Sequence, residues 1–81
     1  MKIMLVASAA FDDAEKIASN IEHERKKAGY ESASDAARAF GVSRPTYSKF
    51  ESAKEVKKRT IEELEKLAYL FGCPVERFFM E

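Results

Sequence analysis

Three glycines constrain the fold of this chain more than any other feature of its sequence. Gly29, Gly41 and Gly72 each stand just after a stretch in which apolar residues recur with helical spacing. Glycine at such a place ends a helix readily, because it adopts the left-handed backbone conformation without a steric penalty. The three glycines therefore predict helices that end at tight turns.

Apolar residues at positions i, i+3 and i+4 give each stretch one inward face, which is typical of an amphipathic helix. The predicted helices are Asp12–Ala28, Ala33–Phe40, Arg44–Glu51 and Thr60–Phe71, with a short turn or helix after Pro74. Capping residues stand at their starts: Asp12 with Glu15, Ser32 with Asp35, Ser43, and Thr60 with Glu63. The predicted inward faces hold Ala14, Ile17, Ala18, Ile21, Arg25, Ala36, Ala37, Phe40, Tyr47, Phe50, Ile61, Leu64, Leu67, Ala68 and Phe71. We expect an all-α fold, a compact bundle of four to five short helices.

The N-terminal segment 1–11 is apolar, and its structure stays open at this stage. Its strongly apolar run, Ile3–Val6, is too short for periodicity to distinguish a strand from an extension of the next helix. The run is also shorter than the roughly 7–15 residues of a signal peptide and far below a membrane span. We therefore divide the chain into segment 1–11, used for core packing or dimerisation, and a domain over residues 12–81, with no membrane partner.

The titratable residues exclude several classes of site. Cys73 is the single cysteine and His23 the single histidine, so the chain holds neither an internal disulfide nor a zinc site. No nucleophile–base pair, metal-ligand set or phosphate-binding loop is present. We expect no catalytic residues, no metal, no cofactor and no enzyme activity, and a reducing, cytoplasmic location. Cys73 is expected to be a small buried apolar residue.

Two of the predicted helices are short and are separated by only Gly41-Val42-Ser43, which is the pattern of a helix-turn-helix motif. In this motif the first helix braces the second, and the second presents its outward side chains to base edges in the major groove of DNA. The second helix, Arg44–Glu51, is called the recognition helix below. Tyr47 and Phe50 would face inward with Ala37, Phe40 and Val42, while Arg44, Thr46, Ser48 and Lys49 would face outward.

From about Ile17 to Phe79 the chain resembles the Cro/C1-type (XRE-like) helix-turn-helix family of phage repressors and bacterial regulators. The resemblance is carried, in order, by the pieces ERKKAGYES, ASDAARAFGVSRPTYSKFESAK and TIEELEKLAYLFGCPVERFF. It implies a lambda-repressor-like helix-turn-helix fold and binding to double-stranded DNA.

The resemblance also implies roles for single positions. Bases would be contacted by Arg44, Pro45, Ser48 and Lys49, and phosphates by Ala33, Ser34, Ser43 and Thr46. Two positions depart from the family pattern. Pro45 replaces a polar residue, so it would contact bases by apolar contact with a thymine methyl group. Ala53 replaces a glycine after the recognition helix, so this exit would be a longer helix or a strained residue.

Basic residues are concentrated after the recognition helix, although the whole chain has a formal net charge of zero. Between Arg44 and Arg59 there are six basic and two acidic residues. Further phosphate contacts are therefore expected from Lys54, Lys57, Lys58 and Arg59. The alternative is that this basic segment, residues 54–59, is a solvated loop. The basic residues Arg25, Lys26 and Lys27 are expected to serve the end of the first helix rather than DNA.

The sequence predicts a sequence-specific DNA-binding protein, a transcriptional repressor that acts as a homodimer on a palindromic operator. One short recognition helix contacts few base pairs, and a two-fold pair multiplies the specificity. The alternative is an antitoxin or adaptor that mainly binds a protein partner, such as a toxin or a regulator, with DNA binding secondary. The dimer surface is open between segment 1–11 and the Phe78–Phe79 end.

Overall fold

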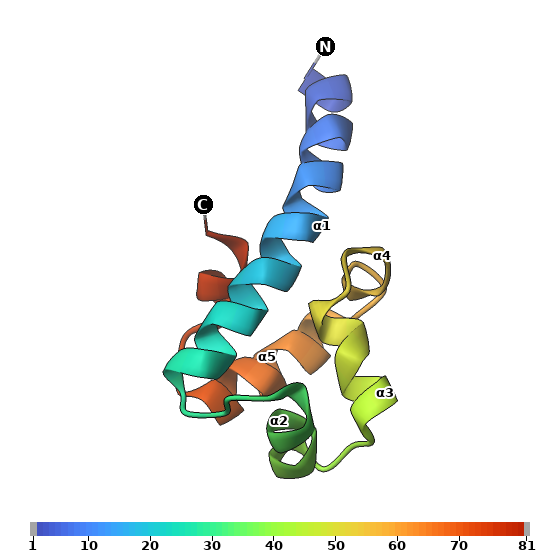
Figure 1. The fold of residues 1–81 in the computed structure, drawn as a ribbon. Coiled ribbons are helices and arrows are strands. Elements are labelled where there is room, and N and C mark those ends of the chain that lie inside the picture. The colour runs from blue at the N-terminus through green and yellow to red at the C-terminus, as the bar shows by residue number, and fades with distance from the viewer. Residues whose placement is uncertain (1, 81) are drawn as a thin grey trace.

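Five α-helices and two short 3₁₀ helices make up the fold (Figure 1). The structure is a computed structural model that describes the backbone of residues 2–80 and the side chains of residues 14–80. The elements are α1 (Lys2–Lys27), α2 (Ala33–Phe40), α3 (Arg44–Ser48), η1 (Lys49–Glu51), α4 (Ala53–Val56), α5 (Ile61–Phe71) and η2 (Val75–Phe79). Residues 2–80 contain no strand, so the predicted all-α bundle is confirmed.

One apolar core joins these elements. In Figure 1, α1 runs diagonally across the bundle, and it packs against η1, α4, α5 and η2. Helix α2 packs against α3 and α5. The buried apolar residues are Ala14, Ala18, Ile21, Ala36, Ala37, Tyr47, Phe50, Val56, Leu64, Leu67, Ala68, Phe71 and Phe78. All the helices contribute side chains to this core, α1 from Ala14 onward. Because α1 packs against both η1 and η2, it supports the recognition helix and the C-terminal end.

Helix α1 is longer than the sequence predicted. The predicted helix start, with Asp12 and Glu15 as its cap, is wrong because the helix begins at Lys2 and continues through Asp12. No glycine or proline lies between Lys2 and Lys27, so nothing in this stretch stops a helix. The first turns extend beyond the rest of the molecule in Figure 1, which accounts for extents of 43 × 22 × 20 Å. The prediction that segment 1–11 serves core packing or dimerisation concerns side chains that lie outside the described residues 14–80.

Helix α2 begins and ends as predicted. The Ser32 side chain accepts a hydrogen bond from the backbone N–H of Asp35 at 3.1 Å, so Ser32 caps the helix. Gly41 ends it with a φ of 84°, and the N–H groups of Gly41 and Val42 donate to the Ala37 carbonyl at 2.9 and 3.0 Å. A residue with a side chain is strained at this φ, which is why glycine suits the turn.

The exit from the recognition helix differs from the prediction. Residues 54–59 were predicted to be a basic connection, but Ala53–Val56 forms helix α4. Val56 is 2% exposed and anchors α4 in the core. Ser52 is extended, with φ −107° and ψ 125°, and no residue from 2 to 80 other than glycine has a positive φ. Ala53 therefore replaces the family glycine without strain, because it begins a new helix.

Helix α5 has the predicted capping box. The Glu63 N–H donates to the Thr60 side chain at 3.1 Å, and the Thr60 N–H donates to the Glu63 carboxylate at 2.8 Å. The apolar stripe is confirmed from Leu64 onward, but the inward position predicted for Ile61 is wrong, since this side chain is 55% exposed. Ile61 is the first residue of α5 and precedes the first buried position, Leu64, by a full turn.

The two phenylalanines at the C-terminal end, Phe78 and Phe79, differ in burial. The sequence alone did not decide whether they lie in the core or at a dimer surface. Phe78 is completely buried and its ring lies against that of Phe71, whereas Phe79 is 48% exposed. The Asn20 amide of α1 donates to the carbonyls of Phe78 and Met80, at 3.1 and 2.6 Å. Phe78 is therefore a core residue, and of the pair only Phe79 remains accessible.

Candidate nucleic-acid interface

The recognition helix begins at a well-formed cap. Ser43 is extended, and its hydroxyl oxygen accepts the backbone N–H of Thr46 at 3.3 Å while its O–H donates to the Thr46 hydroxyl at 3.0 Å. Pro45 lies in the first turn, where a missing N–H costs no hydrogen bond. The helix tightens from α3 to the 3₁₀ geometry of η1 at Lys49. The start at Arg44 and the end at Glu51 agree with the prediction.

The inner side of the recognition helix is an aromatic cluster. Tyr47 is completely buried and Phe50 is 2% exposed, as predicted. Their ring centroids lie 5.9 Å apart, and Phe40 of α2 meets Phe50 edge-on at 5.7 Å and 88°. Aromatic pairs of this geometry stabilise beyond the area they bury. The cluster therefore fixes the recognition helix against α2.

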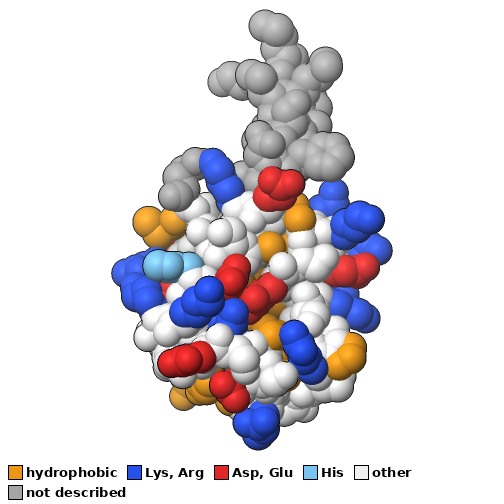
Figure 2. Space-filling model, in the orientation of Figure 1, with side chains coloured by type: hydrophobic (Ala, Val, Ile, Leu, Met, Phe, Trp, Pro, Cys, Tyr) orange, Lys and Arg blue, Asp and Glu red, His pale blue; other side chains and the backbone are white. Residues whose placement is uncertain are grey.

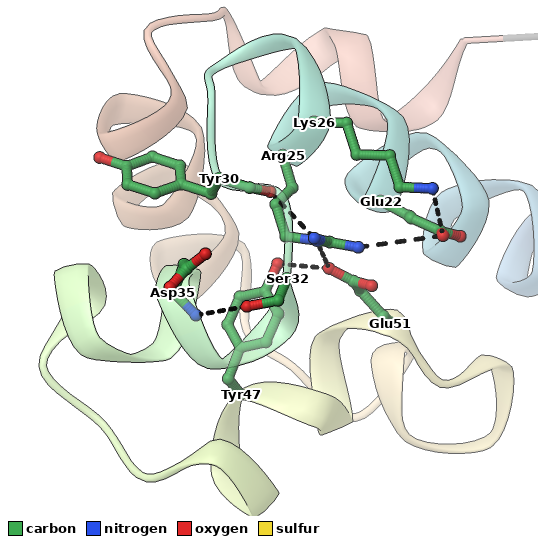
Figure 3. A network of polar contacts seen from close by, with 8 residues as sticks. All are labelled: Glu22, Arg25, Lys26, Tyr30, Ser32, Asp35, Tyr47 and Glu51. Atoms are coloured by element: carbon green, nitrogen blue, oxygen red, sulfur yellow. Dashed lines mark hydrogen bonds and ion pairs between the residues drawn. The ribbon is translucent and has the colours of Figure 1, made fainter.

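A buried polar network holds the same helix against α1 (Figure 3). The Arg25 guanidinium donates to the Glu51 carboxylate at 2.8 Å and to the Tyr30 carbonyl at 2.9 Å. The Tyr47 hydroxyl donates to the same Glu51 oxygen at 2.5 Å. The side chains of Arg25 and Glu51 are 5% and 15% exposed, so both charges are largely removed from water.

The network keeps Tyr47 protonated. Burial, followed by the hydrogen bond to Glu51 and the nearby carboxylate charge, raises the pKa of Tyr47 far above its ordinary value. The phenol therefore stays a hydrogen-bond donor to Glu51 over the whole physiological pH range.

Arg25 was predicted to serve the end of the first helix, and no role was predicted for Glu51. A signal for both was nevertheless present in the sequence. Arg25 falls on the inward stripe of α1, and a buried cation there requires an acidic partner. Tyr47 and Glu51 are four residues apart, so they lie on the same face of a helix.

The outer side of the recognition helix is exposed and cationic. Arg44, Pro45, Thr46 and Lys49 are exposed, while Ser48 is half-buried. Neither Arg44 nor Lys49 has a hydrogen bond or ion pair with any side chain of residues 14–80. Both cations are therefore available for a partner molecule. The structure brings all four predicted base-contacting residues onto one short helix.

The bracing helix presents less to a partner than the recognition helix does. Ala33 and Ser34, predicted to contact phosphate, are half-buried in the first turn of α2. Arg38 is more exposed, and its guanidinium lies 3.4 Å from the Asp35 carboxylate.

The basic segment, residues 54–59, has one member that differs from the rest. Lys54, Lys57 and Lys58 are exposed, and Lys58 lies 3.9 Å from Glu55 in a weak surface pair. The Arg59 side chain is only 18% exposed and lies 3.7 Å from the Glu63 carboxylate. Figure 2 shows Lys and Arg side chains gathered at the right edge of this view, where Figure 1 places α4. This edge is a cationic surface beside the recognition helix.

A separate open cavity of about 270 Å³ lies between the ends of α1 and α5. Glu24 is buried in its wall, 4.0 Å from Lys27 and 3.8 Å from Arg77. Cys73, expected to be buried, is half-buried beside it. Burial and the Glu24 charge raise the pKa of the Cys73 thiol, so it stays protonated at neutral pH.

The described part of the chain lacks two other kinds of site. Within residues 14–80, no three His, Cys, Asp or Glu side chains come together as ligands for a metal ion. None of the helices in residues 2–80 is both long and apolar enough to cross a membrane.

Comparison with known proteins gives one match. The family model described as helix-turn-helix, of the Cro/C1 type, matches residues 21–78. No curated protein and no solved structure is similar enough to count as a match. The matched range begins within α1 and ends at the buried Phe78, so it contains the cap, the aromatic cluster, the buried network and the basic segment. The chain belongs to the Cro/C1-type helix-turn-helix family of DNA-binding regulators.

Proposed function

We propose that this protein is a transcriptional repressor that binds a palindromic operator in double-stranded DNA as a homodimer. The observation that carries the proposal is the pair of exposed cations on the recognition helix, Arg44 and Lys49, which form no hydrogen bond or ion pair with a side chain of residues 14–80. They stand on a helix whose other side is fixed by the aromatic cluster and by the Arg25–Glu51 pair. A rigid helix with free donors on its outer side suits the major groove, which presents acceptors at the edges of guanine and thymine.

In this proposal, the exposed lysines that follow the recognition helix contact the DNA backbone. Lys54, Lys57 and Lys58 would neutralise phosphates beside the groove, and Ala33, Ser34, Ser43 and Thr46 would approach the backbone at the starts of α2 and α3. Arg59 contributes less, because its guanidinium is mostly buried and lies beside Glu63. Neutralised phosphates release counterions, so they supply affinity that falls as salt concentration rises.

The proposed dimerisation is supported by the short length of the recognition helix. The recognition helix spans eight residues, Arg44–Glu51, and a helix of this length contacts only a few base pairs. Two copies related by a two-fold axis would place two such helices about one helical turn of DNA apart, roughly 34–36 Å. The proposal therefore requires inverted half-sites whose centres lie about 10 base pairs apart.

Selection of bound sequences from a random duplex pool tests the proposal. We expect an inverted repeat, bound at nanomolar protein concentration with an affinity that falls steeply between low and physiological salt. A pool that stays random after selection contradicts the proposal, and so does a half-site without an inverted copy.

Two charge reversals assign the binding to the recognition helix. Lys49→Glu and Lys66→Glu each reverse the charge of an exposed lysine on a helix. Lys49 lies on the recognition helix, whereas Lys66 lies on α5. We expect Lys49→Glu to abolish operator binding and Lys66→Glu to leave it within about twofold. Equal losses in both variants would show that only the overall charge matters.

The second candidate function is that of an antitoxin or adaptor that mainly binds a protein. The observation that favours it is the first part of α1, which lies outside the family match and extends beyond the bundle in Figure 1. Purification from the native host after nuclease treatment discriminates the two functions. A stoichiometric protein that stays bound to the Lys49→Glu variant supports the second function, and a chain that purifies alone supports the first.

A further inference from the structure

The outer side of the recognition helix carries two cations, one apolar ring and the hydroxyls of Thr46 and Ser48, but no amide and no free carboxylate. Arg44 and Lys49 can only donate, and the exposed ring of Pro45 offers carbon and hydrogen alone. This composition decides which base edges the helix can recognise.

The one carboxylate of the recognition helix is already occupied. Glu51 accepts hydrogen bonds from Arg25 and Tyr47 and is 15% exposed, so it faces the core and not the groove. A carboxylate is the side chain that accepts from the amino group of cytosine. The network that orients the helix therefore also removes its means of contacting cytosine.

Amides are missing as well. The chain has no glutamine, and its single asparagine, Asn20, donates to the carbonyls of Phe78 and Met80 at the C-terminal end. Asparagine and glutamine are the side chains that pair with both the donor and the acceptor of adenine. The hydroxyls of Ser43 and Thr46 bond to each other at the cap, and Ser48 is half-buried.

We infer that each operator half-site is recognised through its guanine and thymine edges, an inference that rests on the proposed function. Adenine and cytosine are then specified only as the pairing partners of thymine and guanine. Guanine presents two acceptors to the major groove, and thymine presents one acceptor and a methyl group. Arg44 contacts a guanine, Pro45 packs on the methyl group of a neighbouring thymine, and Lys49 contacts a further guanine one turn along the helix.

Base analogues in the selected operator test this inference. Uracil in place of thymine removes only the methyl group, and at one position in each half-site it should weaken binding about threefold to fourfold, the contribution of one buried methyl group. Replacing guanine by 7-deazaguanine removes one acceptor and should weaken binding about fivefold to tenfold at the position that Arg44 contacts. Replacing adenine by 7-deazaadenine should leave the affinity within about twofold at every position.

Variants tie each analogue to its residue. Pro45→Ser should bind the uracil and thymine operators equally, and Arg44→Ala should bind the 7-deazaguanine and guanine operators equally. Circular dichroism and thermal unfolding confirm that both variants are folded. If binding responds to 7-deazaadenine, or if no uracil or 7-deazaguanine position changes the affinity, the inference is wrong while the selected operator still supports the proposed function. If selection yields no preferred sequence, the inference and the proposed function both fail.

Discussion

The inner and outer sides of the recognition helix are formed by neighbouring residues of the chain but solve different physical problems. On the inner side, Tyr47 and Phe50 are buried and Glu51 is bonded to Arg25. On the outer side, Arg44 and Lys49 are exposed and form no hydrogen bond or ion pair with a side chain of residues 14–80. The inner side of this helix therefore provides stability and orientation, and its outer side is left for recognition. Changes on the two sides should therefore separate folding from DNA binding.

The largest expected effect is on the inner side. Phe50→Ala removes a ring that lies against both Phe40 and Tyr47, and we expect the free energy of unfolding to fall by about 3–5 kcal/mol. A domain of this size has little more stability than that to lose. Chemical denaturation measures the change. Lys49→Ala, one residue away on the outer side, should shift the same curve by less than about 0.5 kcal/mol while weakening DNA binding.

The buried ion pair gives the next largest effect. Arg25→Met leaves the Glu51 carboxylate buried without its cation, so we expect a loss of about 3 kcal/mol in the free energy of unfolding. The neighbouring Lys26→Met removes an exposed pair with Glu22 at 3.1 Å and should cost less than about 1 kcal/mol. Replacing both Arg25 and Glu51 by Met should recover only part of the loss, because no charge is then left unpaired but the buried Tyr47 hydroxyl loses its acceptor. Equal losses for Arg25→Met and Lys26→Met would contradict the role given to the network.

The two sides also differ in how far the sequence alone could define them. Helix ends at Gly41 and Gly72 and the caps at Ser43 and Thr60 depend on neighbouring residues, so local patterns predicted them correctly. The outward position of Arg44 and Lys49 followed from periodicity for the same reason.

The features that were missed depend on distant contacts. Arg25 and Glu51 are 26 residues apart, and no local pattern joins them. Helix α4 is held by Val56 in a core built from all the other helices, while Ile61 is exposed because the core ends one turn later on α5. The N-terminal turns of α1 were ambiguous because a run of four apolar residues fits a strand and a helix equally well.

Above pH 10, the pH dependence of stability reports on the inner side through Tyr47. The folded-state pKa of Tyr47 is raised above its unfolded value of about 10, so stability from this group is present below pH 10 and is lost as the pH rises above it. Between pH 10 and 11 we expect wild-type stability to fall more steeply than that of Tyr47→Phe, by up to about 1.4 kcal/mol per pH unit. Parallel curves for the two proteins would mean that the phenol is accessible to ionisation in the folded state.

The smallest expected effect compares two helix caps of the same kind. Ser43 caps the recognition helix and Thr60 caps α5, each through a side-chain oxygen that accepts a backbone N–H. Ser43→Ala and Thr60→Ala should each lower the free energy of unfolding by about 1 kcal/mol. Only Ser43→Ala should also weaken operator binding by severalfold, because fraying at Arg44 and Pro45 adds an ordering cost to binding and because the proposed approach of the Ser43 hydroxyl to a phosphate is lost.

Fluorescence anisotropy with the selected operator, at a temperature where both cap variants are fully folded, separates these contributions. If both variants lose affinity equally, the loss results from lower global stability. DNA binding by the outer side then does not require the cap at Ser43 in particular. If Thr60→Ala alone keeps its affinity, the cap at Ser43 connects the two sides. It then holds the exposed residues in the helical form that the buried residues orient.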